Sequence, residues 1–180
     1  MPQPIKAVQG LSARGGPKII LERPKLAALL GAISAEWGDI DTLFSDIFNL
    51  ITFAKFIPIG AHSRSALSSA VFDQSFTSYK SKIEVIKRII KLRYSKNILD
   101  EFEKLTTDIR KKAKQRNELI HCTWQVCDKY PEDLIQIPNQ RWIRYTERDF
   151  NSTLNRSVLI RNALNDFFIK LSHSQRLEGD

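Results

Sequence analysis

The sequence predicts an all-α protein, an antiparallel bundle of four or five helices with a short extended or β-hairpin segment before the last helix. Three observations lead to this prediction. Apolar residues recur at alternating steps of four and three, as in helices packed side by side. The length of 180 residues and the apolar fraction of 42% fit one domain with a proper core. One region, residues 123–146, breaks the helical pattern.

The chain is expected to contain one domain. We expect residues 1–22 to be a loose lead-in, residues 23–172 to be a single helical domain, and residues 173–180 to be a polar tail. No stretch approaches about 18 consecutive apolar residues, and the N-terminus lacks the apolar region of a signal peptide, so no contact with a membrane is expected. Cys122 and Cys127 have neither a disulfide framework nor metal-type spacing, which favours a cytoplasmic protein with two ordinary thiols.

The first helix is predicted to begin at Pro24, because proline is well tolerated in a first turn, where its missing N–H is not needed. It should end near Phe56. A stripe with a seven-residue repeat predicts a long helix beside near-parallel neighbours. The stripe consists of Leu26, Leu30, Ile33, Trp37, Ile40, Phe44, Ile47 and Ile51.

Residues 65–94 form a second helical region, in which we expect a break between Thr77 and Ser81 and thus two short helices. A third helix should follow, with Asn97 as its N-cap. The apolar stripe of this third helix is Ile98, Phe102, Leu105, Ile109 and Ala113, then Arg116 or Asn117, then Ile120.

Residues 123–146 are rich in β-branched and aromatic residues and are interrupted by Pro131 and Pro138, which predicts a β-hairpin or extended segment. The last helix should begin near Thr146 or Glu147. Thr146 and Asp149 resemble a capping box there.

Three polar residues fall near the apolar line at the end of the third helix: Arg116, Asn117 and His121. Asn117 and His121 are four residues apart and share a face, and Arg116 lies at its edge. A structural interpretation is that Arg116 and Asn117 cap the helix end while His121 is a satisfied, half-buried histidine. The other interpretation is a functional site.

The charge balance is basic, with 28 Lys and Arg against 20 Asp and Glu, a formal net charge of +8. This balance favours anionic partners such as nucleic acid. Four basic residues directly before the polar residues are candidates for binding RNA, although they also fit a solvated helix face. They are Arg110, Lys111, Lys112 and Lys114.

The six residues "RNELIH", 116–121, fit the pattern Arg, polar residue, three variable residues, His, and this pattern resembles the motif of the HEPN superfamily. The stretches "EWGDIDTLFSDI", "SKIEVIKRII" and "YTERDF", together with Trp124 three residues after the histidine, look like bacterial stand-alone members. The resemblance covers residues from about 24 to 171.

This resemblance implies a metal-independent endoribonuclease of bacterial toxin or defence type, with no cofactor. His121 would act as acid or base, Arg116 would hold the phosphate, and Asn117 would orient His121 or bind the phosphate. A homodimer would bring two motifs to one cleft, and a nucleotidyltransferase-like antitoxin would be the protein partner. The alternative is a non-catalytic module that binds a protein or a nucleotide. A sequence-specific DNA binder is a third class, but we find no helix-turn-helix pattern.

Overall fold

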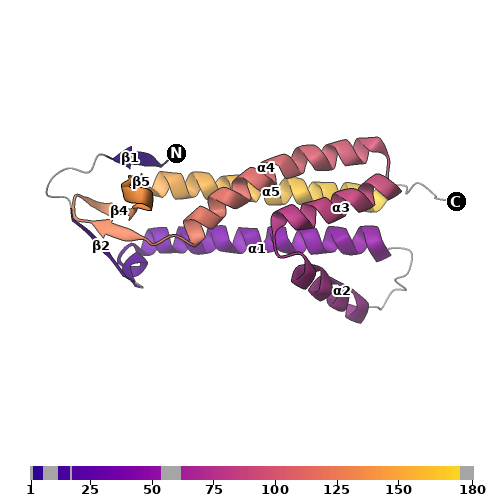
Figure 1. Ribbon diagram of the computed structural model, residues 1–180, viewed down its shortest axis with the longest axis horizontal. Helices are drawn as coiled ribbons and strands as arrows, with labels where there is room; N and C mark the ends of the chain where they lie inside the picture. Colours follow the sequence, from indigo (N-terminus) through magenta and orange to yellow (C-terminus); the bar gives the residue numbers. More distant parts are fainter. Residues whose placement is uncertain (1, 6–11, 17, 54–61, 175–180) are drawn as a thin grey trace. The chain divides into compact units, whose positions relative to one another are not determined.

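The computed structural model describes residues 2–5, 12–16, 18–53 and 62–174. Within these residues the chain forms five α-helices, two short 3-10 helices and five strands (Figure 1). The helices are α1 (Pro24–Phe53), α2 (His62–Ser75), α3 (Tyr79–Arg93), α4 (Lys96–Ile120) and α5 (Glu147–His173). The 3-10 helices are η1 (Ile19–Glu22) and η2 (Pro138–Gln140).

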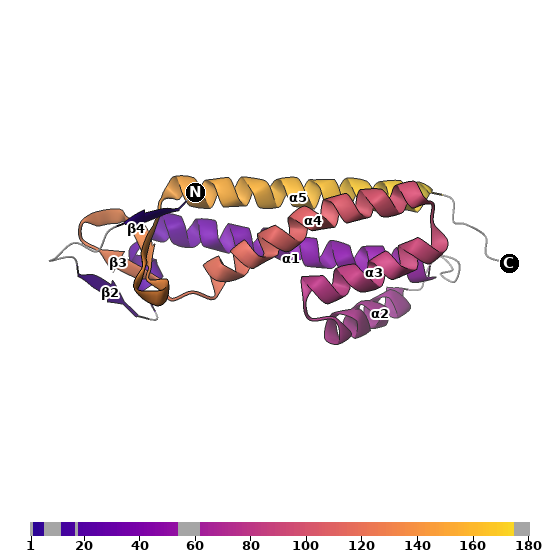
Figure 2. The same ribbon diagram turned by 45° about the horizontal axis from the view of Figure 1, so that its top comes forward.

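The predicted all-α fold class is wrong, because the strands form a five-stranded antiparallel sheet in the order β1-β5-β4-β3-β2. Its strands are β1 (Gln3–Ile5), β2 (Ala13–Gly15), β3 (Gln125–Cys127), β4 (Tyr130–Gln136) and β5 (Trp142–Tyr145). The extended segment expected before the last helix supplies the three inner strands, and Figure 2 shows β2, β3 and β4 lying side by side. The two edge strands come from the stretch that was expected to be a loose lead-in.

The edge strands explain why the sheet was not predicted. Each is three residues long, too short for an alternating pattern to stand out. Strand β1 also pairs with β5, so Gln3 lies opposite Arg144, a residue far from it in the sequence. Pro4 fits this edge position because a proline has no N–H to donate to a neighbouring strand.

The helix boundaries lie near those expected from the sequence. Helix α1 begins at Pro24, while its expected end near Phe56 lies outside the described residues. The break between α2 and α3 covers residues 76–78. The predicted N-cap Asn97 is wrong, since α4 begins at Lys96 and the carbonyl of Ser95 accepts the N–H groups of Ile98 and Leu99.

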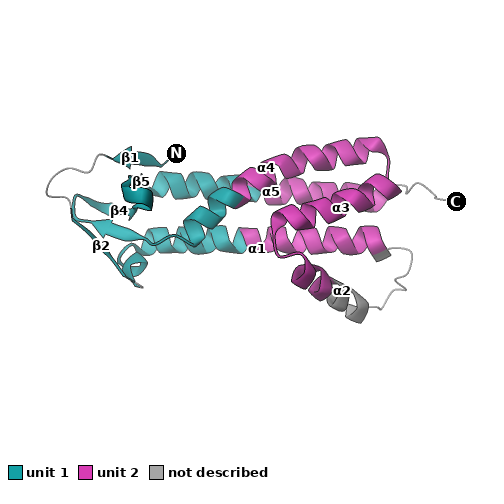
Figure 3. Ribbon diagram, in the orientation of Figure 1, with its two compact units in different colours: residues 1–36, 114–158 teal, residues 37–113, 159–180 magenta. Residues whose placement is uncertain are grey.

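The chain divides into two compact units, shown in different colours in Figure 3. Unit 1 contains residues 1–36 and 114–158, and unit 2 contains residues 37–113 and 159–180. Unit 1 holds the whole sheet. The core of unit 1 includes Leu26, Ile33, Leu119, Trp124, Val126, Leu134, Ile135 and Phe150, all buried.

The core of unit 2 is built by apolar and aromatic side chains of all five helices. The Trp37 and Tyr79 rings meet edge to face with centroids 5.3 Å apart, and Phe102 lies against Phe167 at 5.5 Å. Several isoleucines fill the space around these rings without any exposure. They are Ile40, Ile47, Ile51, Ile83, Ile86, Ile90 and Ile109.

Unit 2 also buries the ammonium group of Lys82, whose side chain is only 4% exposed. It donates to Asp41 on α1 at 2.6 Å and to Asp73 on α2 at 2.7 Å. It also lies 5.5 Å from the centre of the Phe72 ring. This ion triad ties three helices together, and a buried cation needs such partners to be tolerated.

The pKa of Lys82 shows whether burial or the two carboxylate partners has the larger effect on its charge. Burial acts to lower this pKa, but the hydrogen bonds and charges of Asp41 and Asp73 outweigh burial and raise it above its ordinary value of 10.5. A raised pKa in the folded state gives stability that is complete below the unfolded-state pKa and is lost as the pH rises through the folded one. The triad therefore stabilises the fold fully at neutral pH, and this stabilisation is lost only above about pH 10.5.

We expect Lys82→Ala to lower the free energy of unfolding by about 2–4 kcal/mol, since it leaves two carboxylates without their shared cation and a void in the core. The estimate lies below that for a fully buried pair because Asp41 and Asp73 are half exposed. Urea unfolding at pH 7 measures the change. The matched control is Lys80→Ala, an exposed lysine on the same helix, which should change stability by less than about 0.5 kcal/mol. Equal effects of the two variants would contradict the role of the triad.

Candidate functional site

The three polar residues singled out in the sequence lie in unit 1, where α4 ends. Helix α4 stops at Ile120, and the N–H of His121 still donates to the carbonyl of Asn117 at 3.0 Å. Asn117 and His121 are therefore one helical turn apart on the same face, and both side chains are exposed. The His121 ring has no hydrogen-bond partner among the described residues, so it is open to solvent and not a buried structural group.

The Arg116 side chain is half-buried, in contrast to the exposed Asn117 and His121. Its Nη1 donates to Oδ1 of Asn117 at 3.0 Å, while its Nε is buried without a hydrogen-bond partner in the described part of the chain. Of the two residues expected to follow Ala113 in the apolar stripe, Arg116 is the half-buried one. The expected capping role is not seen, since within the described residues neither Arg116 nor Asn117 donates to a carbonyl of the last turn of α4.

The turn after His121 is fixed by the side chain of Gln136, which is buried in β4. Its Nε2 donates to the carbonyl of Glu118 at 3.4 Å and lies 2.8 Å from the Cys122 sulfur. Its Oε1 accepts the hydroxyl of Tyr145 on β5 at 3.1 Å. The Tyr145 ring in turn meets Trp124 edge to face at 5.2 Å. Strands β4 and β5 thus hold the end of α4 in place.

Two titratable groups of this network are neutral at physiological pH. Burial raises the pKa of the Cys122 thiol to about 11, although the hydrogen bond from Gln136 acts in the opposite direction. Burial, followed by the nearby Cys122, Glu118 and Asp149, raises the pKa of Tyr145 to about 12. Cys122 therefore has none of the thiolate character that a nucleophilic cysteine requires.

The four basic residues before the site are not equivalent. Arg110 is paired with Glu84 at 2.5 Å, so its charge is already compensated. Lys112 is half-buried, whereas Lys111 and Lys114 are exposed. By helical geometry Lys114 lies about one turn before Asn117 on the exposed face that also carries His121. Lys114 is therefore the basic residue best placed to act with the polar residues.

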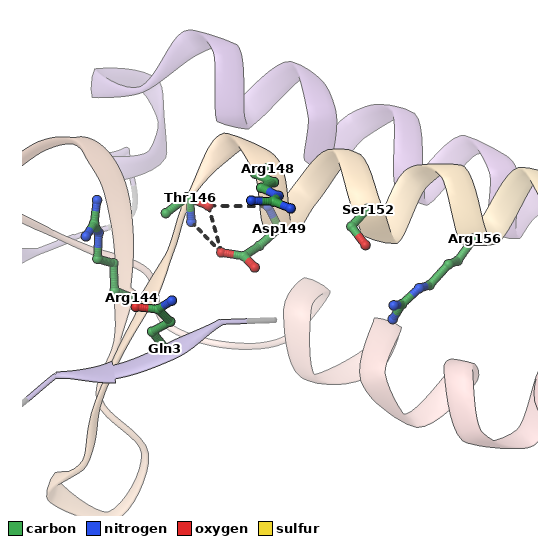
Figure 4. A pocket seen from close by; sticks show the side chains of 7 residues that line it. All are labelled: Gln3, Arg144, Thr146, Arg148, Asp149, Ser152 and Arg156. Carbon is green, nitrogen blue, oxygen red and sulfur yellow. Dashed lines mark hydrogen bonds between the residues drawn. The ribbon is translucent and has the colours of Figure 1, made fainter.

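A pocket in unit 1, of about 580 Å³, was not predicted from the sequence (Figure 4). Its lining residues are Gln3, Arg144, Thr146, Arg148, Asp149, Ser152 and Arg156. Part of this pocket could have been found in the sequence. Its α5 residues Arg148, Ser152 and Arg156 are spaced by four, so they must share one face of a helix. The contribution of Gln3 and Arg144 depends on the pairing of β1 with β5, which no local pattern reveals.

Neither a metal centre nor a membrane span is found in the described part of the chain. Among its residues, no three His, Cys, Asp or Glu side chains gather in an arrangement that could hold a metal ion. None of the described helices combines the length and the apolar character needed to cross a membrane.

Comparisons with protein-family models, with curated proteins and with solved structures found no match. The functional assignment accordingly rests on the geometry of this chain and on the resemblance of residues 116–121 to the HEPN motif.

We expect Cys122 to resist alkylation. With a pKa of about 11, its thiolate fraction at pH 8 is only about one in a thousand, and iodoacetamide reacts with the thiolate. Mass spectrometry of the folded protein at pH 8 should show slow modification that accelerates about tenfold per pH unit up to pH 10. The urea-unfolded chain, with an ordinary thiol pKa, is the control and should react at once. Fast modification of Cys122 in the folded protein would contradict the raised pKa.

The hydrogen bond between Tyr145 and Gln136 should be detectable as a coupling energy. A double-mutant cycle with Tyr145→Phe and Gln136→Leu should give about 1 kcal/mol of interaction, the usual net value of such a bond. Urea unfolding of the wild type, the two single variants and the double variant supplies the four free energies. Additivity within about 0.3 kcal/mol would show that the two side chains do not stabilise each other.

Proposed function

We propose that the chain is a metal-independent endoribonuclease of bacterial toxin or defence type that cleaves RNA through attack of a ribose 2′-hydroxyl. The observation that carries the proposal is the arrangement at the end of α4: an exposed imidazole on His121, one turn from an Asn117 carboxamide that is hydrogen-bonded to the guanidinium of Arg116. The resemblance to the HEPN motif gives this arrangement its proposed role.

The proposed reaction needs only groups that these residues provide. The 2′-oxygen attacks the neighbouring phosphorus, an O2′–P bond forms, and the bond from phosphorus to the 5′-oxygen breaks. The products are a 2′,3′-cyclic phosphate and a 5′-hydroxyl. His121 accepts the proton of the 2′-hydroxyl or donates one to the leaving 5′-oxygen, since imidazole can do either near neutral pH.

Arg116 would stabilise the negative charge that develops on the phosphate. A guanidinium is always protonated and can bind two phosphate oxygens at once. The bond from Arg116 to Asn117 suggests that Asn117 is a positioning residue for the guanidinium. The Nε of Arg116 is buried and has no described partner, so contact with a phosphate would fall to the terminal nitrogens of the guanidinium.

One imidazole serves poorly as both acid and base in the same step. A two-fold homodimer would bring a second copy of His121 and Arg116 to a shared cleft, in which one imidazole accepts a proton while the other donates one. Lys114, on the exposed face of the same helix, would lie at the rim and bind the RNA backbone. A nucleotidyltransferase-like antitoxin that covers this cleft is the proposed protein partner.

We expect His121→Ala to lower the rate of RNA cleavage by about 10²–10⁴-fold, which is the usual loss when a general acid or base is removed. Arg116→Ala should have an effect of similar size, and Arg116→Lys should restore activity only in part because lysine lacks the planar fork. The assay is digestion of a mixed RNA panel in the presence of EDTA.

The matched control is His173→Ala, an exposed histidine near the end of α5, which should keep full activity. Circular dichroism and the thermal midpoint establish that each variant is folded. A folded His121→Ala protein with wild-type activity would exclude the catalytic role. A wild type that cuts no RNA across the panel would favour the non-catalytic binding module.

The shared cleft makes a separate prediction about mixed dimers. Wild-type subunits are unfolded and refolded together with subunits that carry both Arg116→Ala and His121→Ala. The mixed dimers should have well under half of the wild-type activity, because each lacks one of the two imidazoles and one of the two guanidinium groups of the shared cleft. Light scattering should show a dimer at micromolar concentration. Half of the wild-type activity in verified mixed dimers, as expected for two independent sites, or a monomer by light scattering, would contradict the composite site.

A further inference from the structure

The pocket of unit 1 lies where strands β1 and β5 meet the start of α5, and none of the residues 116, 117 and 121 lines it (Figure 4). Its volume of about 580 Å³ exceeds that of a single small anion. Its lining side chains are polar or charged throughout, with arginine the most frequent residue type. The ligand that such a pocket suits depends on which of these charges remain available.

Three of the lining residues are already engaged within the protein. Arg144 donates from Nε to Asp133 at 2.5 Å and lies over the Tyr130 ring, and Figure 4 shows its guanidinium directed away from the other lining side chains. The carboxylate of Asp149 accepts both the N–H and the hydroxyl of Thr146, at 3.0 and 2.8 Å. This carboxylate, the only one among the described lining residues, is therefore used to cap α5.

Among the described residues, Arg148 and Arg156 remain as the cations of the pocket. Both are exposed, and neither forms an ion pair with a described residue. The hydroxyl of Ser152 lies between them on the same face of α5 (Figure 4). The two arginines are eight residues apart, which corresponds to about 12 Å along the helix axis.

This spacing favours a linear ligand with several negative charges. A cavity of about 580 Å³ with two cations along its helix can hold more than one phosphate group, and an extended strand presents successive phosphates. Among the described lining residues there is no aromatic side chain on which a nucleotide base could stack. Guanidinium groups and a hydroxyl are suited to bind phosphate oxygens, and such contacts do not depend on base identity.

We propose that this pocket binds the sugar–phosphate backbone of single-stranded nucleic acid, at a position separate from the polar residues of α4. With the proposed function this strand is RNA, a part of the same substrate away from the bond that is cut. Binding through phosphates alone does not require the 2′-hydroxyl, so single-stranded DNA of equal length should bind too.

The test uses full-length protein and fluorescence anisotropy with a labelled single-stranded DNA, which cannot be cut by 2′-hydroxyl attack. The double variant Arg148→Ala/Arg156→Ala should bind about tenfold or more weakly at low salt. The slope of log affinity against log salt should become shallower by about 1.4, or 0.7 for each phosphate that is no longer neutralised. The control is Arg88→Ala/Arg141→Ala, which removes the same charge from two exposed arginines outside the pocket and should retain the wild-type slope.

Equal losses in the two double variants would overturn the proposal, since they would show only an effect of net charge. An unchanged salt slope in Arg148→Ala/Arg156→Ala would also overturn it. So would a pocket that binds tripolyphosphate through these arginines but binds neither RNA nor DNA. Because the probe is not cleaved, a wild type that binds as expected yet cuts no RNA would remove the proposed function and leave this site standing.

Discussion

The arrangement of the candidate site depends on a single buried amide, the side chain of Gln136. A helix end leaves carbonyl groups without partners, and Gln136 satisfies that of Glu118 while it also contacts the Cys122 sulfur and accepts the Tyr145 hydroxyl. Strands β4 and β5 thereby fix the turn in which His121 stands. The imidazole itself takes no part in this network. Its backbone is held while its ring stays open to solvent, a condition suited to proton transfer with a ligand.

Two partly or fully buried cations differ in how far the protein satisfies them with hydrogen bonds and charges. Lys82 in unit 2 has two carboxylates within 2.7 Å and stabilises the helices around it. Arg116 in unit 1 has one described hydrogen bond, to Asn117, and keeps a buried Nε without a partner. An unsatisfied buried donor costs roughly 1–3 kcal/mol. Lys82 therefore has its charge compensated inside the fold, whereas Arg116 keeps an unsatisfied donor there.

The sequence was sufficient for features encoded in neighbouring residues. Pro24 and the regular stripe of α1, the break before Tyr79 and the Thr146–Asp149 cap all arise from local spacing. An extended or β-hairpin segment at residues 123–146 was predicted, but its extension into a five-stranded sheet was missed. Gln3 pairs with Arg144 far along the chain, and each edge strand has only three residues. The pocket was missed for the same reason, since Gln3 and Arg144 line it together only because β1 pairs with β5. Which of Arg116 and Asn117 turns inward was also undecided, because both positions lie near the edge of the apolar stripe.

The chemistry of the cleaved ends tests the central claim most directly. A defined RNA is incubated with the wild type in EDTA, and the products are analysed by mass spectrometry. Attack by the 2′-hydroxyl should leave a 2′,3′-cyclic phosphate or its opened 3′-phosphate on one fragment and a 5′-hydroxyl on the other. Replacement of the ribose at the cleavage site by deoxyribose should abolish the cut. Fragments with 5′-phosphate and 3′-hydroxyl ends, or cleavage at the deoxyribose, would contradict the account.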